Sequence, residues 1–205
     1  MEIQQLERRF QGCLVGLAVG DALGAPVEGL TREAIAAQFG RITSMISTGR
    51  PGLSPVDYTD DTAMMLCIAE SLVERGEFDP EDVADRFLKW YQTNPLLLAG
   101  RTTIAALEAL DSSVPWNRAG EVAHQRLGTS AGNGALMRCA PIALRYFRDE
   151  RNLIKASADS ALITHWDLQA RWAAVALNLI IARLLLGRRE GVLEEVIPKI
   201  MHPRV

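Results

Sequence analysis

The sequence has few cysteines, and it contains no apolar run long enough to span a membrane. Its three cysteines, Cys13, Cys67 and Cys139, lie far apart in apolar helical patterns. We expect them to be small buried side chains in the reducing environment of the cytoplasm. The longest apolar stretch, residues 173–186, is interrupted by two polar residues and is shorter than the roughly 20 residues that a membrane helix needs. We therefore expect no membrane span.

Basic residues are not in excess either, because 22 Lys and Arg stand against 25 Asp and Glu and no basic stripe runs along the sequence. A protein that neutralises nucleic-acid phosphates needs such a stripe, so we expect no nucleic-acid-binding surface. A secretory leader is not expected, because Glu2 and Glu7 interrupt its positively charged start. With 205 residues, of which 48% are hydrophobic, the chain can build one sizeable core.

Apolar residues recur at helical spacing along most of the chain. Asp79 and Pro80 are typical of a helix start, and Gly76 is typical of a helix end. Only residues 42–46 have the character of a strand, so we predict an all-α fold, with one orthogonally packed multi-helix domain over residues 1–205. Helices are expected at residues 2–19, 60–76, 79–94, 102–110, 135–147, 153–163 and 167–186, with a weaker tendency up to residue 127 and a kink or break at Pro141.

Two of these helices carry further expectations. Residues 167–186 are apolar on nearly every side, which predicts the central buried helix of the fold. The first helix has Gly12, Gly16 and Gly20 at intervals of four residues, and such a ladder favours the close approach of another backbone.

A cluster of oxygen-bearing side chains, Thr59, Asp60 and Asp61, stands where a glycine- and proline-rich loop meets a helix start. Hard divalent cations prefer such ligands, and adjacent residues on a helix point about 100° apart, so Asp60 and Asp61 could reach two different ions. The alternative is an ordinary helix cap, in which Thr or Asp accepts a backbone N–H and a second Asp faces the helix dipole. The cluster alone leaves both interpretations open, and capping is the commoner use of Asp at a helix start.

Three further blocks accompany this cluster. Residues 20–28 read Gly-Asp-Ala-Leu-Gly-Ala-Pro-Val-Glu, residues 130–138 read Ser-Ala-Gly-Asn-Gly-Ala-Leu-Met-Arg, and residues 164–167 read Thr-His-Trp-Asp. In this order and at these separations, the four blocks resemble the ADP-ribosylglycohydrolase family over nearly the whole chain. That family includes the dinitrogenase-reductase-activating glycohydrolases and the hydrolases of ADP-ribosyl-arginine and ADP-ribosyl-serine.

The resemblance implies a role for each block. Thr59, Asp60 and Asp61 would be ligands in a two-Mg²⁺ site, with Mn²⁺ as the alternative ion. Asp60 and Asp61 would serve catalysis together with Glu28, which matches a glutamate that gates the cleft in several members. The substrate, ADP-ribose or an ADP-ribosylated protein, would lie against Gly132, Asn133, Gly134, Met137, Arg138 and His165.

One departure from the family pattern concerns the rest of the metal site. Members carry a second acidic block, Asp-x-Asp-Thr, near their C-terminus, and this sequence reaches Val205 without one. We therefore expect the chain to be truncated at its C-terminus. Asp21 and Asp167 are conceivable substitute ligands, but their spacing equally fits capping or turn roles.

The substrate-binding residues also have ordinary structural interpretations. A glycine-rich turn before a helix exposes backbone N–H groups that suit a diphosphate, but residues 132–134 could equally form a tight interhelical turn. The third glycine of a dinucleotide fingerprint is missing, and no strand is expected before this turn. Arg138 could pair with a surface carboxylate, His165 could bond a backbone carbonyl, and Glu28 could be a solvated loop residue.

We therefore predict a Mg²⁺-dependent hydrolase that removes ADP-ribose from modified proteins or small conjugates. The first alternative is a module of the same fold that binds ADP-ribose or a nucleotide without hydrolysing it. The second is a helical interaction protein in which the acidic cluster is only a cap. Truncation would also leave one apolar helical face without an evident partner, which favours self-association. That face consists of Leu193, Val196, Ile197 and Ile200.

Overall fold

The computed structural model describes residues 2–47, 54, 57–94 and 99–201. These residues form ten α-helices, two 3-10 helices and no β-strand, so the all-α prediction is confirmed and the strand character assigned to residues 42–46 is wrong. The elements are α1 (Ile3–Gly24), η1 (Ala25–Val27), α2 (Arg32–Gln38), α3 (Asp60–Arg75), α4 (Pro80–Thr93), α5 (Arg101–Asp111), α6 (Trp116–Leu127), η2 (Asn133–Ala135), α7 (Ala140–Tyr146), α8 (Glu150–Leu162), α9 (Leu168–Leu185) and α10 (Val192–Met201).

Local sequence signals set most of the helix ends. Asp79 caps α4 by accepting hydrogen bonds of 3.1 and 3.2 Å from two backbone N–H groups of the first turn, and Pro80 follows it. Gly76 ends α3 in the left-handed conformation, with φ of 75°. The break expected at Pro141 is confirmed, because this proline lies in the first turn of α7, where its missing N–H costs no helical hydrogen bond.

The sequence patterns did not predict α2, and they predicted only a weak helical tendency where α6 forms. Helix α2 has seven residues and no buried side chain, so it carries no apolar stripe that could have revealed it. Thr31 nevertheless caps it, by accepting a hydrogen bond of 3.2 Å from the backbone N–H of Ala34. Helix α6 is regular over twelve residues and ends at Gly128 with φ of 74°.

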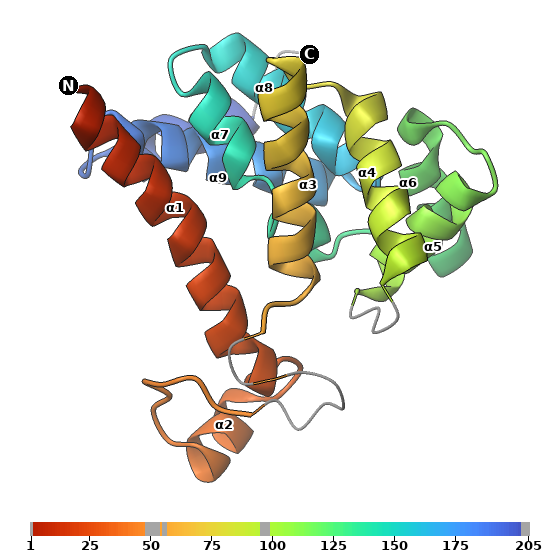
Figure 1. Cartoon of the computed structure of the whole chain (residues 1–205), viewed down its shortest axis with the longest axis horizontal. Helices are drawn as coiled ribbons and strands as arrows, with labels where there is room; N and C mark the ends of the chain where they lie inside the picture. The colour runs from red at the N-terminus through yellow and green to blue at the C-terminus, as the bar shows by residue number, and fades with distance from the viewer. Residues whose placement is uncertain (1, 48–53, 55–56, 95–98, 202–205) are drawn as a thin grey trace.

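Helix α9 lies in the core, as its sequence predicts. It packs against α7, α8 and α10, and Figure 1 shows it running behind α7. Its Ala174, Val175 and Leu179 side chains are at most 1% exposed. One apolar cluster joins α9 to Phe87 of α4 and Leu107 of α5, so the two halves of the molecule share a core.

Helix α1 behaves differently from α9. It is 22 residues long, it extends away from the body of the molecule, and only its Ala22 is buried. The close approach expected at its glycine ladder is wrong for the described residues, because a Cβ added at any of the three glycines would meet no atom within 4 Å. The close approach occurs instead at Gly120 of α6, where a Cβ would lie 2.5 Å from the carbonyl oxygen of Leu162.

The apolar face of α10, which we expected to lack a partner, is partly buried: two of its four side chains pack against the core and two are exposed. Val196 is 1% exposed in the contact of α10 with α9, and Ile200 packs against the main apolar cluster. Leu193 and Ile197 remain 56% and 46% exposed. A helix that presents one stripe to the core leaves the neighbouring positions in solvent.

Two helical segments are long and apolar enough to cross a membrane, judged by length and composition alone. They are Ile3–Val27 and Leu168–Leu185. Within the protein, 44% of the second segment is buried, as for the core helix of a globular fold, but only 17% of the first. The absence of a membrane span stays a prediction.

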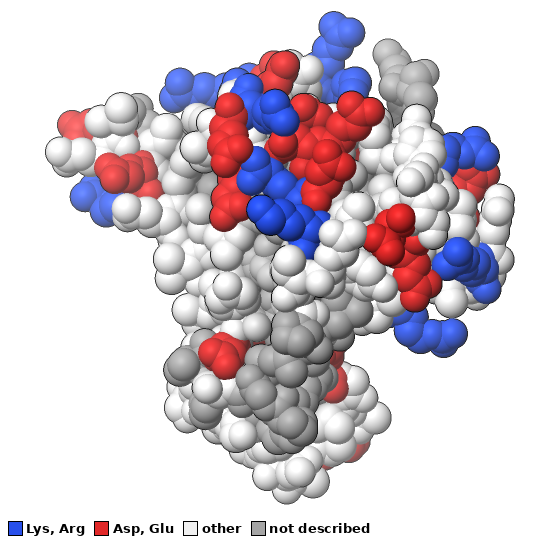
Figure 2. Space-filling model, turned by 45° about the vertical axis from the view of Figure 1, so that its right-hand side comes forward, with Lys and Arg blue, Asp and Glu red and all other residues white. Residues whose placement is uncertain are grey.

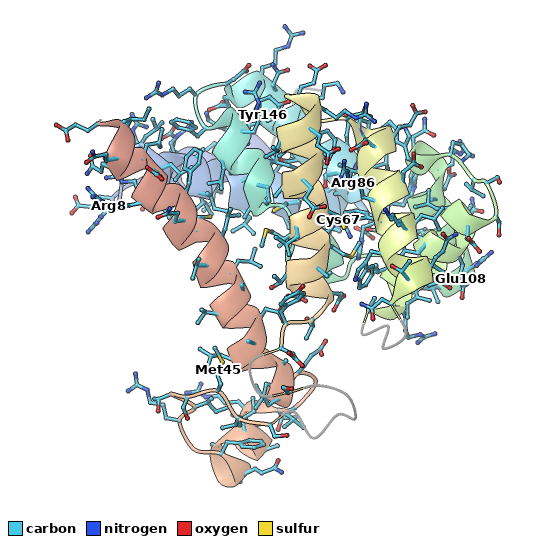
Figure 3. All side chains as sticks on the ribbon, in the orientation of Figure 1. Arg8, Met45, Cys67, Arg86, Glu108 and Tyr146 are labelled. Carbon is cyan, nitrogen blue, oxygen red and sulfur yellow. The ribbon has the colours of Figure 1, made fainter. Side chains whose placement is uncertain are left out.

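Acidic and basic side chains lie interspersed on the surface, as Figure 2 shows for the face that it presents. Arg86 of α4 lies near Cys67 of α3 in Figure 3 and forms ion pairs of 2.5 to 3.4 Å. Its partners are Glu70 and Glu74 of α3 and Asp82 of its own helix. These pairs join α3 to α4 and place acids beside bases. The expectation that no nucleic-acid surface exists stays a prediction.

Candidate functional site

A cleft of about 450 Å³ opens where the end of α1 and the starts of α3 and α5 meet η2. Nine of the ten candidate site residues line it, although they come from four separate stretches of the chain. The fold therefore brings together in one cleft residues that the sequence showed only as separate blocks along the chain. The nine are Glu28, Thr59, Asp60, Asp61, Gly132, Asn133, Gly134, Met137 and His165.

One side of the cleft, which we call the acidic wall, consists of Asp21, Glu28, Thr59, Asp60 and Asp61. Asp21 organises it. One oxygen of its carboxylate accepts hydrogen bonds from the backbone N–H of Thr59 at 2.9 Å and from the N–H and hydroxyl of Thr62 at 3.1 and 2.7 Å. The other oxygen accepts a bond of 2.7 Å from the Thr59 hydroxyl. These four bonds satisfy the start of α3 and tie it to the end of α1.

Thr59 also caps α3, since its hydroxyl oxygen accepts a long hydrogen bond of 3.5 Å from the backbone N–H of Asp61. The capping interpretation of the acidic cluster therefore holds for this residue, alongside its place in the cleft. The glycine- and proline-rich segment before Tyr58 lies largely outside the described residues.

The carboxylates of the acidic wall are crowded and partly buried. Burial raises the pKa of Asp60 from its ordinary value of 3.8 to about 7, and the charges of Asp61, Glu28 and Asp21 act in the same direction. The pKa of Asp61 is also raised, first by burial and then by the charge of Asp21. Neither Asp60 nor Asp61 forms an ion pair with a lysine or arginine in the described part of the chain. Burial and crowding therefore make ionisation of Asp60 and Asp61 unfavourable in the absence of a bound cation.

Another part of the lining, which we call the glycine wall, consists of Gly132, Asn133, Gly134, Met137 and His165. The turn packs tightly on the imidazole ring. A Cβ added to Gly134 would lie 2.8 Å from Cε1 of His165 and 2.9 Å from the hydroxyl oxygen of Thr103, so only glycine fits. His165 is 1% exposed, and burial, followed by the positive charge of Arg138, lowers its pKa from 6.5 to about 3. The ring is therefore neutral at pH 7.

The start of α5 also lines the cleft, and the sequence reasoning did not find it. Gly100 precedes the helix and has no side chain with which to cap it, so the first backbone N–H groups of α5 lack a helical partner. Gly100 to Thr103 contribute four lining residues. A glycine immediately before an apolar helix was the available signal, but it does not distinguish an open anion site from an ordinary chain turn.

Arg138 does not line the cleft, and it does not pair with a surface carboxylate. The structure places it behind the glycine wall, with its side chain fully buried. Its Nη2 donates to the carbonyl oxygen of Ser160 at 3.1 Å and to the hydroxyl of Thr164 at 2.7 Å. Its guanidinium also lies 4.6 Å from the ring centre of Phe87. The side chain points into the core because two oxygens of the α8 end accept its protons there.

The acidic wall suits a divalent cation in the chemistry of its donors. Its hard oxygen atoms and crowded carboxylates are of the kind that Mg²⁺ or Mn²⁺ prefers. Among the described residues, however, no group of three or more His, Cys, Asp or Glu side chains is arranged to hold a metal ion. Of the two conceivable substitutes, Asp21 is engaged at the start of α3, and Asp167 caps α9 through a bond of 2.8 Å from Gln169 N–H. The donor set is suitable in kind but partial.

Comparison with known proteins identifies the family to which the chain belongs. The model of the ADP-ribosylglycohydrolase family matches residues 2–203. The chain belongs to this family. It is 38% identical over 197 residues to an uncharacterised protein of Archaeoglobus fulgidus, covering 95% of this chain and 62% of that protein. It is 32% identical over 198 residues to the ADP-ribosyl-[dinitrogen reductase] glycohydrolase of Rhodospirillum rubrum, covering 95% of this chain and 64% of the relative.

A solved structure described as an ADP-ribosylglycohydrolase-related protein complex agrees with this assignment. It superposes with a TM-score of 0.78 at 37% identity, over 96% of this chain and 63% of that one. The chain thus spans a little under two thirds of the length of these relatives. Membership of the family and the all-α fold expected from the four sequence blocks are both confirmed. The roles of the individual residues stay predictions.

Proposed function

We propose that the chain forms the ADP-ribose cleft of a Mg²⁺-dependent glycohydrolase that removes ADP-ribose from modified proteins or small conjugates. The observation that carries the proposal is that carboxylate-rich and glycine-rich segments, far apart in the sequence, line one cleft. Each wall suits a different part of ADP-ribose. The family assignment supports the reaction class, and the name of the Rhodospirillum rubrum relative gives ADP-ribosyl-[dinitrogen reductase] as the substrate of that protein.

The glycine wall and the start of α5 are suited to the diphosphate. Backbone N–H groups that a helix start leaves unsatisfied are ready donors to phosphate oxygens, and the absence of a Cβ at Gly134 lets a ligand approach the backbone. Neutral His165 keeps one ring N–H with which it can donate a hydrogen bond. These residues bind and orient the ligand.

The acidic wall is suited to the anomeric end of the ribose. Cleavage there passes through an oxocarbenium-like transition state, whose positive charge nearby carboxylates stabilise. Asp60, with a pKa near 7, can hold or release a proton close to neutral pH, and exposed Glu28 stands at the mouth of the cleft. Thr59, Asp60 and Asp61 would hold Mg²⁺. When bound, the ion would orient ribose hydroxyls and supply activated water.

The partial ligand set favours one second candidate, a module that binds ADP-ribose without hydrolysing it. No three-residue metal cluster is found within the described ranges, although the glycine wall is complete. The two candidates differ in product release alone. For either one we propose the cytoplasm as the compartment, since none of the three cysteines is in a disulfide.

The deciding experiment measures release of free ADP-ribose from arginine-linked and serine-linked peptides, with Mg²⁺ and with a chelator. Calorimetry with ADP-ribose and with adenosine is run beside it. Release that needs Mg²⁺ supports the hydrolase, and tight binding of ADP-ribose without release supports the binding module. If the chain neither binds ADP-ribose better than adenosine nor releases it, both candidates are wrong.

A further inference from the structure

Arg138 carries a positive charge in the core, and no residue that the structure describes forms an ion pair with it. It is fully buried, it stands behind the glycine wall, and its Nε has no hydrogen-bond partner among the residues described. Burial lowers its pKa to about 10, so it remains charged at pH 7. Keeping an unpaired cation in a core is unfavourable, which calls for a contact that compensates for it.

The hydrogen bond from Arg138 to Thr164 connects the buried guanidinium to His165. A guanidinium can only donate hydrogen bonds, so the Thr164 hydroxyl oxygen must accept the 2.7 Å bond from Arg138 Nη2. The same oxygen lies 2.7 Å from Nδ1 of His165. Thr164 is itself 0% exposed, and these two groups are the only hydrogen-bond partners of its hydroxyl within the described ranges.

This arrangement decides where the imidazole proton lies. If the Thr164 hydroxyl donates to Nδ1, both this hydroxyl and Nδ1 are satisfied, and the ring proton must be on Nε2. If Nδ1 carried the proton, the hydroxyl proton would be buried without an acceptor, which is unfavourable. An imidazolium would have the same defect and would also face the charge of Arg138, in agreement with a pKa near 3.

The other ring nitrogen, Nε2, lies beside Gly132 in the lining of the cleft. His165 lines the cleft, and a Cβ added to Gly132 would lie 3.5 Å from its Nε2. Nε2 makes no hydrogen bond to any residue that the structure describes. An Nε2–H group at this point is a donor directed at whatever occupies the glycine wall.

We propose that Arg138 is a positioning residue, which acts through Thr164 to hold His165 as a neutral Nε2–H donor to an oxygen of the bound ligand. The inference rests on the proposed function, because that ligand oxygen would belong to ADP-ribose. It also accounts for the Arg of the block at residues 130–138, which sequence reasoning had placed against the substrate itself.

The first test reads the tautomer directly in the ligand-free protein. Nitrogen-15 NMR of the imidazole groups at pH 7 separates protonated from unprotonated nitrogens, and His165→Gln identifies the signal. We expect a protonated Nε2 and an unprotonated Nδ1 in the wild type and in Thr164→Ser, which keeps the hydroxyl. Thr164→Val, of nearly the same volume, should lose this pattern. A wild-type protein with the proton on Nδ1, or a Thr164→Val variant with an unchanged pattern, would overturn the proposal.

The second test measures ADP-ribose affinity by calorimetry. Loss of one oriented hydrogen-bond donor should weaken binding about tenfold in Thr164→Val and in Arg138→Met, and Arg138→Lys should recover part of it, because an ammonium can still donate to Thr164. Thr93→Val is the matched control, since it removes an exposed hydroxyl that bonds the backbone carbonyl of Lys89.

The two tests separate this proposal from the proposed function. Wild-type protein that fails to bind ADP-ribose contradicts the proposed function, while the tautomer pattern still decides the role of Arg138. Removing a buried guanidinium can unfold the chain, and thermal unfolding of Arg138→Met is therefore measured first. Thr164→Val, which leaves the arginine in place, then carries the test. Unchanged affinity in a folded Thr164→Val variant contradicts the positioning role.

Discussion

The two walls of the cleft are built on opposite electrostatic principles. In the acidic wall, burial and neighbouring carboxylates raise the pKa values of Asp60 and Asp61, and no described lysine or arginine pairs with either. In the glycine wall, burial and a cation behind the ring lower the pKa of His165 to about 3 and keep it neutral. One wall thus concentrates charge, and the other removes it and presents hydrogen-bond donors. A ligand with an anionic diphosphate at one end and a developing cation at the other fits that division.

The largest effect should follow from removing the charge of the acidic wall. In Asp60→Asn combined with Asp61→Asn, we expect ADP-ribose release to fall at least a hundredfold, which corresponds to about 2.7 kcal/mol of barrier. The stabilisation of the fold by Mg²⁺, measured as a rise in melting temperature, should also disappear.

The matched control for this variant is Glu70→Gln combined with Glu74→Gln. It makes the same charge change on the same helix, but at exposed positions that pair with Arg86. Both signals should survive in it. Equal melting shifts with Mg²⁺ in the wild type and the Asp60/Asp61 variant would show that the wall does not hold a metal.

The next effect is an opposite pH dependence of stability at the two walls in metal-free buffer. The folded pKa of Asp60 is raised from 3.8 to about 7, so its contribution to stability is present below pH 3.8 and is lost as pH rises through 7. The folded pKa of His165 is lowered from 6.5 to about 3, so its contribution is present above pH 6.5 and is lost as pH falls through 3.

Urea unfolding with a chelator at pH 4.5, 6.5 and 8 measures both contributions. Asp60→Asn should gain stability relative to the wild type by about 3 kcal/mol between pH 4.5 and 8. His165→Gln should gain, relative to the wild type, a similar amount as pH falls from 6.5 to 4.5, about 2 kcal/mol. Differences from the wild type that change in the same direction with pH at both walls would contradict the electrostatic contrast.

A smaller effect should distinguish two glycines of the same turn. Gly134→Val places a branched side chain against His165 and Thr103, so ADP-ribose affinity should fall at least tenfold, or about 1.4 kcal/mol. Gly132→Ala adds a Cβ at an ordinary 3.5 Å from the ring and should change affinity less than about twofold. Calorimetry compares the two, and equal losses would mean that the tight packing at Gly134 is irrelevant to binding.

Much of the site could be predicted from the sequence, and the reason differs from residue to residue. The acidic cluster at Thr59 to Asp61 and the turn at residues 132–134 are contiguous blocks, so their members arrive in the cleft together once the helices form. Arg138 belongs to the same block as the turn, yet its long side chain leaves the cleft for the end of α8. A block motif shows which backbone passes the site, and it does not show which way each side chain turns.

The glycines likewise show that a sequence pattern does not fix which elements pack together. Three glycines spaced by four in α1 predicted a close backbone contact, but nothing described lies near them, whereas isolated Gly120 packs directly on the end of α8. Spacing reports which residues share a helix face. Whether another element reaches that face depends on the whole fold.

The sequence by itself determined most of the helices, many of their ends and the family, because periodicity, caps and turn residues act within one or two helical turns. Only the tertiary structure decided that Asp21 organises the start of α3, and that a buried Arg138 reaches His165 through Thr164. The hydrogen bonds from the start of α3 to Asp21, and from Arg138 to Thr164, join residues that are 26 to 41 positions apart. Hydrogen bonds over such separations form only after packing has placed two helix ends side by side, and no local pattern encodes that placement.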